Sequence, residues 1–464
     1  MWTPDLESSA GPRYLALADA IARDIASGTL RHGERLPTHR ELADRLGITV
    51  GTVTRGFAEA ERRGLTVGEV GRGTFVREAE ESIAWFGSDE SRREGLLEMS
   101  LAMPWRLEGG AEDRALAESL ATLSRCRDLG RLLQYDPDTA NLEQRRRASE
   151  WLRGMQVPAS PESLIVTSGV QHGLTVLLCT ILRPGDTLLA EEVTYPAVKS
   201  LSQALGLSIR GVAMDEGGMI PDALDRACRE GSPRAVYLMP NLQNPTGIRL
   251  GEERREAIAD IAREHGIWII EDEVHRTAAG PKEVPIAARA PERTFHLTSL
   301  SKSVAFGLRV GFLVAPESMV DRLRAGVRTT LWMPPPLMVE IATRWLADGT
   351  ALSLGERRDE EMAARHEILR RELGEIASTP TGEPSIYVWM RLPEPWRGEE
   401  FVAQAKQRGV RLAGSETFAV GQRNVPHAVR ISVSSIEKRD DFERAVSVIA
   451  ELLQGRADAC LDIV

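Results

Sequence analysis

Lysine is the scarcest of the basic residues in this chain. Its 464 residues include 58 lysines and arginines together, of which 53 are arginines. The five lysines are Lys199, Lys282, Lys302, Lys406 and Lys438. Because arginine stays protonated in proteins, it does not act as an amine nucleophile, whereas lysine can. Chemistry that needs a side-chain amine is therefore confined to these five positions.

Cysteine is also scarce, and long apolar runs are absent. Cys126, Cys179, Cys228 and Cys460 are scattered without a CxxC pair, which argues against a disulfide framework and against a zinc site. No segment approaches the roughly 18 apolar residues of a membrane helix, and the acidic N-terminus lacks an apolar segment. We therefore expect a cytoplasmic protein. The net charge of −10 excludes a globally basic nucleic-acid binder but leaves local basic patches open.

One lysine has an unusual sequence context. Lys302 follows Ser299 and Ser301 and precedes Arg309 by seven residues, in a short connection between two apolar, strand-like runs. An amine among hydroxyl side chains, with a guanidinium nearby, suits a Schiff base to an aldehyde cofactor whose phosphate needs such donors. The alternative is a solvated loop lysine, which these residues alone do not exclude.

The first 77 residues contain several helical patterns. Apolar residues recur at helical spacing between positions 14 and 27. Thr38 and Glu41 form a capping box at the start of a short helix, and Thr49 can cap a further helix over residues 50–63. Two such helices joined by a short glycine-containing turn predict a helix-turn-helix.

A hairpin and a local excess of positive charge accompany these helices. Strand-like runs at 65–70 and 74–76 flank Gly71-Arg72-Gly73, a basic-tipped wing suited to DNA phosphates or to the minor groove. Residues 31–77 contain nine arginines and six acidic residues, a net charge of +3 within a protein of −10. Each feature alone is common in packed structure, but their order and spacing are more specific.

Residues 12–77 resemble the winged helix-turn-helix of GntR-type repressors. The resemblance is carried mainly by the segments 33–43 and 71–76. It implies DNA contacts by Arg40, Thr49, Thr52, Arg72 and Gly73. The family often has an arginine just after the threonine that begins the recognition helix, where this chain has Val50. We therefore expect part of the base readout to pass to Arg55, which points away from the apolar face of its predicted helix.

Residues 78–96 predict a linker because they are polar and lack periodicity. Strand-like and helical patterns then alternate, which predicts a mostly parallel sheet with helices on both faces. The expected strands are 164–167, 187–190, 208–213, 235–239, 267–271, 294–298 and 311–314. Polar residues, including Asn241, Asn244, Asp272 and Lys302, each follow such a strand. Open α/β sheets bind their ligands at this end of the strands.

With this pattern, residues 97–464 resemble the fold type I aminotransferases, which use pyridoxal 5'-phosphate (PLP). The implied fold is α/β, with a large domain around a mostly parallel seven-stranded sheet and a smaller C-terminal α/β subdomain. The resemblance implies that Lys302 holds PLP as a Schiff base and that Asp272 keeps the pyridine nitrogen protonated. Arg430 would bind an effector carboxylate. The other implied cofactor contacts are Ser168, Gly169, Val170, Gln171, Tyr195, Asn244, Ser299, Ser301 and Arg309, with Tyr135 from a neighbouring subunit.

Two positions depart from the family pattern. After the aspartate the family usually has an acid and then a tyrosine, whereas this chain has Glu273 followed by Val274. One hydrogen bond to the cofactor ring oxygen is therefore expected to be missing. The segment after Tyr135 usually contains a glycine, but Thr139 and Ala140 stand near that place. Neither departure removes the lysine.

A GntR-like domain fused to an aminotransferase-like domain resembles the MocR/GabR regulators. This resemblance implies a homodimeric, PLP-dependent transcriptional regulator that binds operator DNA and senses an amino-acid-like effector. The amine of the effector would replace Lys302 on the cofactor and form an external aldimine. The alternative is an active aminotransferase with an accessory DNA-binding domain, and Val274 argues slightly against it. The effector stays open. Family members respond to γ-aminobutyrate, taurine, D-alanine or PLP itself, and some regulate the use of ectoine.

Overall fold

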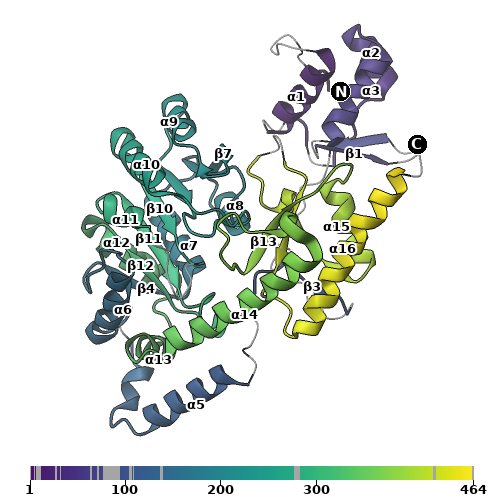
Figure 1. Ribbon diagram of the computed structural model, residues 1–464. Coiled ribbons are helices and arrows are strands. Elements are labelled where there is room, and N and C mark those ends of the chain that lie inside the picture. The colour runs from purple at the N-terminus through teal and green to yellow at the C-terminus, as the bar shows by residue number, and fades with distance from the viewer. Residues whose placement is uncertain are drawn as a thin grey trace. The chain divides into compact units, whose positions relative to one another are not determined.

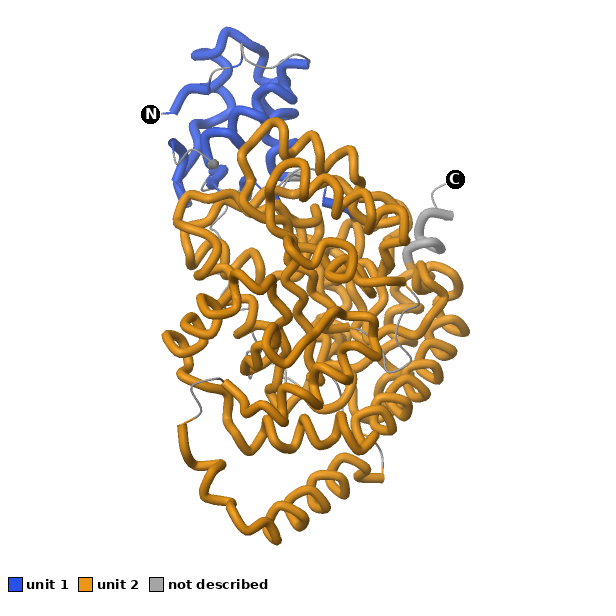
Figure 2. Tube along the Cα trace, turned by 90° about the vertical axis from the view of Figure 1, so that its left-hand side faces the viewer, with its two compact units in different colours: residues 1–88, 421–426 blue, residues 89–420, 427–464 orange. Residues whose placement is uncertain are grey.

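Figure 1 shows the computed structural model of the protein. Its described residues are 2–4, 6, 12–26, 29–31, 33–62, 65–69, 73–76, 95–103, 107, 109–135, 139–275, 283–421 and 425–461. The chain forms two compact units (Figure 2), of which unit 1 comprises residues 1–88 and 421–426 and unit 2 comprises residues 89–420 and 427–464. No helix of the described part of the chain is long and apolar enough to cross a membrane. Residues 78–94 of the predicted linker lie outside the described residues.

The described residues of unit 1 form three helices and a hairpin. Their bounds are α1 Arg13–Ala26, α2 His39–Leu46, α3 Val50–Arg62, β1 Thr66–Glu69 and β2 Gly73–Val76. The capping box at the start of α2 is present, since the Thr38 side chain accepts from the backbone of Glu41 and the Glu41 carboxylate accepts from the backbone of Thr38. Gly47 ends α2 at φ 60°, in the left-handed region that glycine tolerates.

The core of unit 1 fixes the angle between α2 and α3. The ring of His39 packs edge-on against Phe57, with 4.8 Å between ring centroids, and its Nδ1 lies 3.0 Å from the Thr54 hydroxyl. Trp2 joins this core from outside the predicted domain. It is 9% exposed, and its indole N–H donates to Asp24 Oδ2 at 2.6 Å. The domain predicted from the sequence began at residue 12 and did not include Trp2.

Unit 2 is built around a seven-stranded sheet. Its strands are β4 Leu164–Thr167, β5 Thr187–Glu191, β6 Ser208–Val212, β9 Ala235–Leu238, β10 Trp268–Asp272, β11 Thr294–Ser299 and β12 Gly311–Val314. The order across the sheet is β4-β12-β11-β10-β9-β5-β6. Strand β12 runs antiparallel to both of its neighbours, and the other six strands of this sheet run in one direction. The seven predicted strands and the mostly parallel sheet are therefore confirmed.

Helices cover both faces of this sheet because neighbouring strand residues point to opposite sides. On one face Tyr237 and Leu297 pack with α7 (Val170–Ile181) and α12 (Val320–Thr330). On the other face Val236 packs with helices α9 and α10. The remaining helices of the large domain that the structure describes are α5 Ala111–Ser124, α6 Leu142–Gly154, α8 Pro196–Ala204, α9 Pro221–Glu230, α10 Glu252–His265, α11 Ile286–Arg289 and α13 Pro336–Ala347.

A smaller α/β subdomain completes unit 2. The long helix α14 leads from the large sheet to it in sequence (Figure 1). Its sheet has the order β13-β16-β15 with antiparallel pairing. The elements are α14 Thr350–Leu373, β13 Tyr387–Arg391, α15 Gly398–Gln407, β14 Val410–Arg411, β15 Ala413–Gly414, β16 Ala428–Ser432 and α16 Arg439–Leu461. Before all of these in sequence, β3 (Leu97–Glu98) pairs in parallel with β14, and residues 97–100 lie against the subdomain.

Candidate functional site

Lys302 lies just beyond the carboxyl end of β11, in the turn that leads towards β12. Its Nζ donates a hydrogen bond to the carbonyl of Ala102. Part of the side chain is exposed, but its amine is desolvated. This burial, with the charges of Arg430 and Arg309, lowers the pKa of Lys302 to about 7, against a smaller opposing effect of Asp272. An amine with such a pKa is partly neutral near pH 7 and can act as a nucleophile.

Asp272 ends β10, the strand next to β11. Its carboxylate accepts hydrogen bonds from the Tyr237 hydroxyl at 2.8 Å and from the backbone N–H of Val274 at 3.0 Å. Burial nevertheless raises the pKa of Asp272 to about 6. This carboxylate would be stabilised by a cationic partner, and a protonated ring nitrogen is such a partner.

Arg430, on β16 of the small subdomain, is 1% exposed and brings a guanidinium to the same place. It donates to Asn244 Oδ1 at 2.8 Å and to the carbonyl of Ser100 at 2.5 Å. The rings of Phe418 and Tyr387 lie 4.7 and 5.4 Å from its central carbon. Burial lowers its pKa to about 10, so it keeps its charge at neutral pH. Arg430 and Asn244 were predicted in different roles, and the structure joins them by a hydrogen bond.

The start of α7 forms a place suited to an anion. Gly169 precedes the helix at φ 84°, and a Cβ built there would lie 2.9 Å from the Arg309 guanidinium. A Cβ on Gly311 would lie 2.6 Å from the Gly169 backbone, and Gly311 pairs with Ser299 across β11 and β12. These close approaches bring the predicted phosphate residues at 168–171 together with those at 299–309. The first helical amides, at Val170 and Gln171, have no partner within the helix.

The serines predicted to bind the phosphate differ in whether their polar groups already have hydrogen-bond partners. Ser301 is 4% exposed, and its Oγ has no hydrogen-bond partner within the described part of the chain. Ser299 Oγ accepts from the backbone N–H of Ser301 at 3.2 Å. The backbone N–H of Ser168 is already taken, since it donates to His172 Nδ1 at 3.0 Å. Of these groups, the Ser301 hydroxyl is the one that the described residues leave without a hydrogen-bond partner.

The two predicted tyrosines have different surroundings. Tyr195, at the start of α8, is near Asp272, Arg309 and Arg430: burial and Asp272 raise its pKa to about 12, and the two arginines oppose this. Tyr135 is 78% exposed and packs against Trp332, with 5.5 Å between ring centroids. Its exposure leaves it accessible to a second copy of the chain.

Near the place where a glycine is usual in the family, Thr139 takes a glycine-like backbone conformation. Thr139 has φ 69°, in the left-handed region, and is 2% exposed. Its hydroxyl accepts from the backbone N–H of Val166 at 3.3 Å. A tertiary hydrogen bond thus offsets the strain of this backbone angle in a residue other than glycine.

In unit 1 the predicted DNA-contacting residues lie at the start of α2 and α3 and in the hairpin. Arg40 and Thr49 are exposed, and Thr52 is half-buried. The Thr49 hydroxyl accepts from the backbone N–H of Thr52 at 3.1 Å, so Thr49 caps α3 as expected. Gly73 has φ 119°, which favours glycine, and its missing side chain leaves room for the Arg35 guanidinium. Arg72 lies outside the described residues.

Arg55 is exposed, but its guanidinium is not free of contacts. It lies over the ring of Tyr14 on α1, with 4.2 Å from its central carbon to the ring centroid. A base contact by Arg55 would therefore have to replace this cation–π contact. Arg35 was not among the predicted DNA contacts, although it lies against the wing at Gly73.

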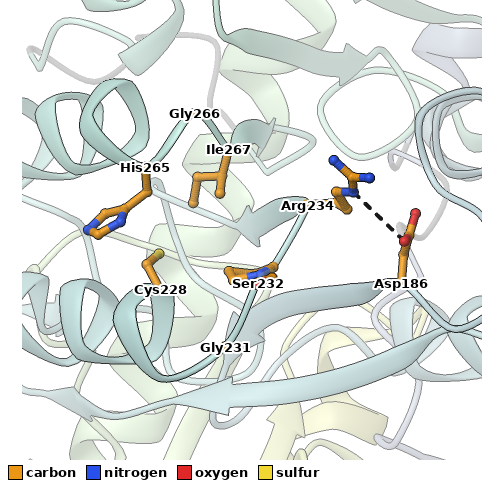
Figure 3. Close-up of a pocket in the computed structure, with 9 residues that line it drawn as sticks. Asp186, Cys228, Gly231, Ser232, Arg234, His265, Gly266 and Ile267 are labelled. Carbon is orange, nitrogen blue, oxygen red and sulfur yellow. Dashed lines mark ion pairs between the residues drawn. The ribbon is translucent and has the colours of Figure 1, made fainter.

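A separate cavity of about 500 Å³ lies at the opposite, amino-terminal ends of β5, β9 and β10. Figure 3 shows Arg234 and Asp186 on one side of it, 3.8 Å apart, with His265 and Cys228 on the other. His265 pairs with Asp225 at 2.7 Å. Burial raises the pKa of the Cys228 thiol to about 11, so it is a poor nucleophile at neutral pH. This cavity lacks the features of a reactive site.

Comparisons with known proteins assign both parts of the chain. Residues 111–449 match the family model of aminotransferase class I and II. The chain belongs to this aminotransferase family. Residues 13–76 match the gntR family of bacterial regulatory proteins. A GntR helix-turn-helix ahead of an aminotransferase-family domain is the architecture of the MocR/GabR regulators.

Curated relatives share this architecture over nearly their whole length. The chain is 28% identical over 452 residues to the uncharacterized HTH-type transcriptional regulator YdeF of Bacillus subtilis, covering 97% of this chain and 96% of YdeF. It is 26% identical to the vitamin B6 salvage pathway transcriptional repressor PtsJ of Salmonella typhimurium, covering 90% and 93%. Among solved structures, an archaeal alanine:glyoxylate aminotransferase matches with a TM-score of 0.70 at 21% identity, over 81% of this chain and 97% of the enzyme. That likeness shows the fold.

The residues of this aminotransferase-family chain fit PLP. The amine of Lys302 suits the aldehyde, the buried carboxyl of Asp272 suits a protonated ring nitrogen, and the orphaned Ser301 hydroxyl suits the phosphate. The Arg309 guanidinium beside Gly169 supplies a cation at the same phosphate place. The donor set thus has one group for each reactive part of the cofactor.

The expected loss of a cofactor hydrogen bond at Val274 stays a prediction. Val274 packs with apolar residues on the same face as Tyr195, and the polar side chain on this turn is one residue later, at His275. Burial, Lys302 and Arg430 lower the pKa of His275 well below its usual range. His275 was not among the site residues predicted from the sequence. Its position three residues after Asp272, in the turn that follows β10, is the sequence signal by which His275 could have been predicted.

Proposed function

We propose that this protein is a PLP-dependent transcriptional regulator that binds an amino-acid-like effector at Lys302 and changes its affinity for operator DNA in response. The observation that carries this proposal is the meeting of Lys302, Asp272 and Arg430 in a chain that also has a gntR-family domain. When bound, PLP supplies an aldehyde that links reversibly to amines and a ring that withdraws electrons.

Three residues of the chain would each interact with a different part of the cofactor or the effector. Lys302, with its pKa near 7, supplies a partly neutral amine. Asp272 favours the proton on the ring nitrogen, because an ionised carboxylate needs a cation when buried. Arg430 offers a guanidinium to an acid group of the effector. The effector class is therefore a small molecule with one amine and one acid group.

The relatives narrow the range of effectors to be screened. The names of two of them concern vitamin B6, namely PtsJ and the pyridoxine biosynthesis regulator PdxR of Corynebacterium glutamicum, and a third is TauR of Rhodobacter capsulatus. We would screen γ-aminobutyrate, taurine, D-alanine, diamino acids related to ectoine, and PLP itself. A catabolic role follows if the effector is also a nutrient.

The test compares two buried lysines. Lys199 has a pKa lowered to about 8 by burial, and it donates to the carbonyls of Glu416 and Thr417, so Lys199→Ala is a matched control for Lys302→Ala. Borohydride reduction should fix PLP to wild type and to Lys199→Ala at residue 302, as mapped by mass spectrometry. The Lys302→Ala variant should retain no reduced cofactor.

The effector half of the proposal uses Arg430→Ala. This variant should bind PLP but lose the change in the cofactor spectrum, and in DNA affinity, that an active amine causes in wild type. Sustained production of new amino acid that depends on a keto acid, at about 1 per second or more as in ordinary enzymes, would contradict the sensor proposal and favour an aminotransferase.

We assign DNA binding to residues 12–77, with Arg40 as a phosphate contact. Arg40→Ala should reduce the slope of log affinity against log salt by about one unit, because each neutralised phosphate releases counterions. Arg146→Ala, which removes the same charge from an exposed site on α6, is the control. Equal slopes for wild type and Arg40→Ala would remove Arg40 from the interface.

A homodimer is proposed from exposed apolar residues near the site. Leu133 is 90% exposed, and Tyr135 and Trp332 are 78% and 51% exposed. Such residues gathered on a monomer mark an interaction surface. Leu133→Glu should shift the sedimentation of the protein from dimer towards monomer, whereas Gln407→Glu on α15 should not. A wild type that sediments as a monomer at micromolar concentration would refute the proposal.

A further inference from the structure

The turn that follows β9 has a strained backbone. Leu242 is 3% exposed and has φ 48°, in the left-handed region that residues other than glycine rarely adopt. A backbone angle of this kind persists only where surrounding contacts enforce it, and such angles cluster at functional sites. The contacts that hold this turn therefore indicate what the turn does.

Two contacts join this turn to the small subdomain. The carbonyl of Leu242 accepts a hydrogen bond from the hydroxyl of Tyr387, the first residue of β13. Two residues further on, Asn244 Oδ1 accepts a hydrogen bond from Arg430 on β16 at 2.8 Å. The turn thus contacts the arginine that is proposed to bind the acid group of the effector.

Gln243 lies between these two contact points in sequence and is 1% exposed. Its Nε2 donates to Glu191 Oε2 at 3.0 Å and to the carbonyl of Val193 at 2.6 Å. Its Oε1 accepts from the backbone N–H of Thr246 at 3.0 Å and from the Thr246 hydroxyl at 2.6 Å. A primary amide has two N–H donors and an oxygen with two lone pairs, so every hydrogen-bonding site of this side chain is used. These bonds fix the orientation of the amide and the course of the chain from 243 to 246.

Glu191 anchors Gln243 to the neighbouring strand. It is the last residue of β5, which runs parallel to β9, and it is 2% exposed. Its Oε2 also accepts from the backbone N–H of Met239 at 3.3 Å. Burial raises the pKa of Glu191 to about 8, against the opposing effects of these two hydrogen bonds. The carboxyl is therefore mostly protonated at neutral pH, and it holds Gln243 without a second negative charge near Asp272.

Resting on the proposed function, in which Arg430 binds the acid group of the effector, we propose that Gln243 is a positioning residue for the recognition of that group. By fixing the turn to Glu191, Gln243 presents Asn244 to Arg430, and the bond between these two side chains holds the guanidinium in one direction. A guanidinium held in one direction binds an acid group with less loss of conformational entropy than a mobile one. Gln243 acts through Asn244 rather than on the effector itself.

The experiment compares pairs of amines that differ in an acid group, using the visible spectrum of the full-length protein loaded with PLP. The acid-bearing probes are γ-aminobutyrate, taurine and D-alanine. Their acid-free counterparts are butylamine, propylamine and isopropylamine, in which a methyl group replaces the acid group. Wild type should bind the acid-bearing member of at least one pair more tightly than its counterpart.

Gln243→Met removes the hydrogen bonds of the amide and keeps a side chain of similar length. We expect it to reduce the preference for the acid-bearing amine about tenfold, as for the loss of one hydrogen bond to a charged group, while the acid-free amine binds within about twofold of wild type. Asn244→Ala should lose the preference by a similar factor. Adding Gln243→Met to Asn244→Ala should cause no further loss, because residues that act through one another are not additive.

If Gln243→Met is insoluble, Glu191→Met removes the anchor of Gln243 and should cause the same loss of preference. Glu191→Gln keeps an acceptor oxygen at that position and should preserve the preference. An unchanged preference in Gln243→Met or Glu191→Met, or an equal loss of affinity for both amines of a pair, would overturn the positioning role. A wild type without a preference in any of the three pairs would instead overturn the proposed function.

Discussion

Two buried charged clusters meet at the end of β10 and hold their charges differently. Glu271 and Glu273 point to one face of the sheet and Asp272 to the other, because side chains alternate along a strand. On the first face Arg255, which is 0% exposed, lies 3.5 Å from Glu273 and 3.9 Å from Glu271. Asn241 donates to Glu273 and accepts from Arg255. Opposite charges face each other directly in this cluster.

In the second cluster, around Asp272 and Lys302, the pKa values of the two groups lie close to neutral pH. The pKa of Asp272 is raised to about 6 and that of Lys302 is lowered to about 7. By contrast, although burial raises the pKa of Glu271, its hydrogen bond with His296 and the charge of Arg255 hold it below the usual value. The difference separates a structural charge cluster from a reactive one: paired charges hold the strand ends, and charges with shifted pKa values are available for chemistry.

The largest expected effect comes from breaking the paired cluster. Arg255→Ala leaves two buried carboxylates without their cation and should destabilise unit 2 by about 3–5 kcal/mol. The measurement is the urea midpoint of unfolding. Arg263→Ala, which removes exposed pairs with Asp260 and Glu292, should cost at most about 1 kcal/mol. Equal decreases in the free energy of unfolding of the two variants would mean that the buried ion pairs of Arg255 stabilise the protein no more than exposed ones.

Lys302→Met should change the stability of the protein by an amount that depends on pH, unlike a substitution in the paired cluster. In the cofactor-free protein the folded-state pKa of Lys302 is about 7, below its ordinary value of 10.5. Burying the ammonium therefore costs stability fully below pH 7, and this cost disappears as the pH rises towards 10.5. Lys302→Met should be more stable than wild type by a few kcal/mol at pH 6.5, with a difference that shrinks steadily by pH 9.5. Thermal unfolding at both pH values measures it, and a difference independent of pH would contradict the lowered pKa.

The smallest expected effect on stability distinguishes Asp272, the last residue of β10, from Glu273, which follows it. Glu273→Gln loses its charge against Arg255 and should cost about 1–3 kcal/mol of stability while PLP affinity stays within about twofold. Asp272→Asn should keep the stability of wild type and lose at least tenfold in PLP affinity, since its amide does not balance a ring cation. Urea unfolding and PLP titration give both quantities. If Glu273→Gln lost PLP affinity and Asp272→Asn lost stability instead, the structural and reactive roles given to the two clusters would be wrong.

The sequence predicted the order of elements better than the partners of individual side chains. Alternating apolar runs located all seven strands, and Thr38 with Glu41 located the start of α2, because these signals are local. Asp272 and Lys302 were found for the same reason: each follows a strand, and strand ends converge at one edge of the sheet.

What the sequence did not predict depends on contacts between distant residues. Asn241 follows β9 as expected, yet its partners are Arg255 and Glu273, fourteen and more residues away. Thr139 takes a glycine-like backbone angle because Val166 bonds its hydroxyl. The orphaned nitrogen of His275 is visible only when every neighbour is placed. Such features follow from tertiary packing, which no local pattern records.

Backbone carbonyls of residues 100 and 102 accept hydrogen bonds from the two basic side chains of the proposed site. Arg430 donates to the carbonyl of Ser100, and Lys302 donates to the carbonyl of Ala102. A ligand acid group or amine must therefore compete with the protein's own main chain. The net affinity is the difference between the bonds that a ligand gains and those that this segment gives up. A ligand that engages only one of these two side chains would leave the hydrogen bond of the other in place, whereas a ligand that engages both must displace both carbonyls.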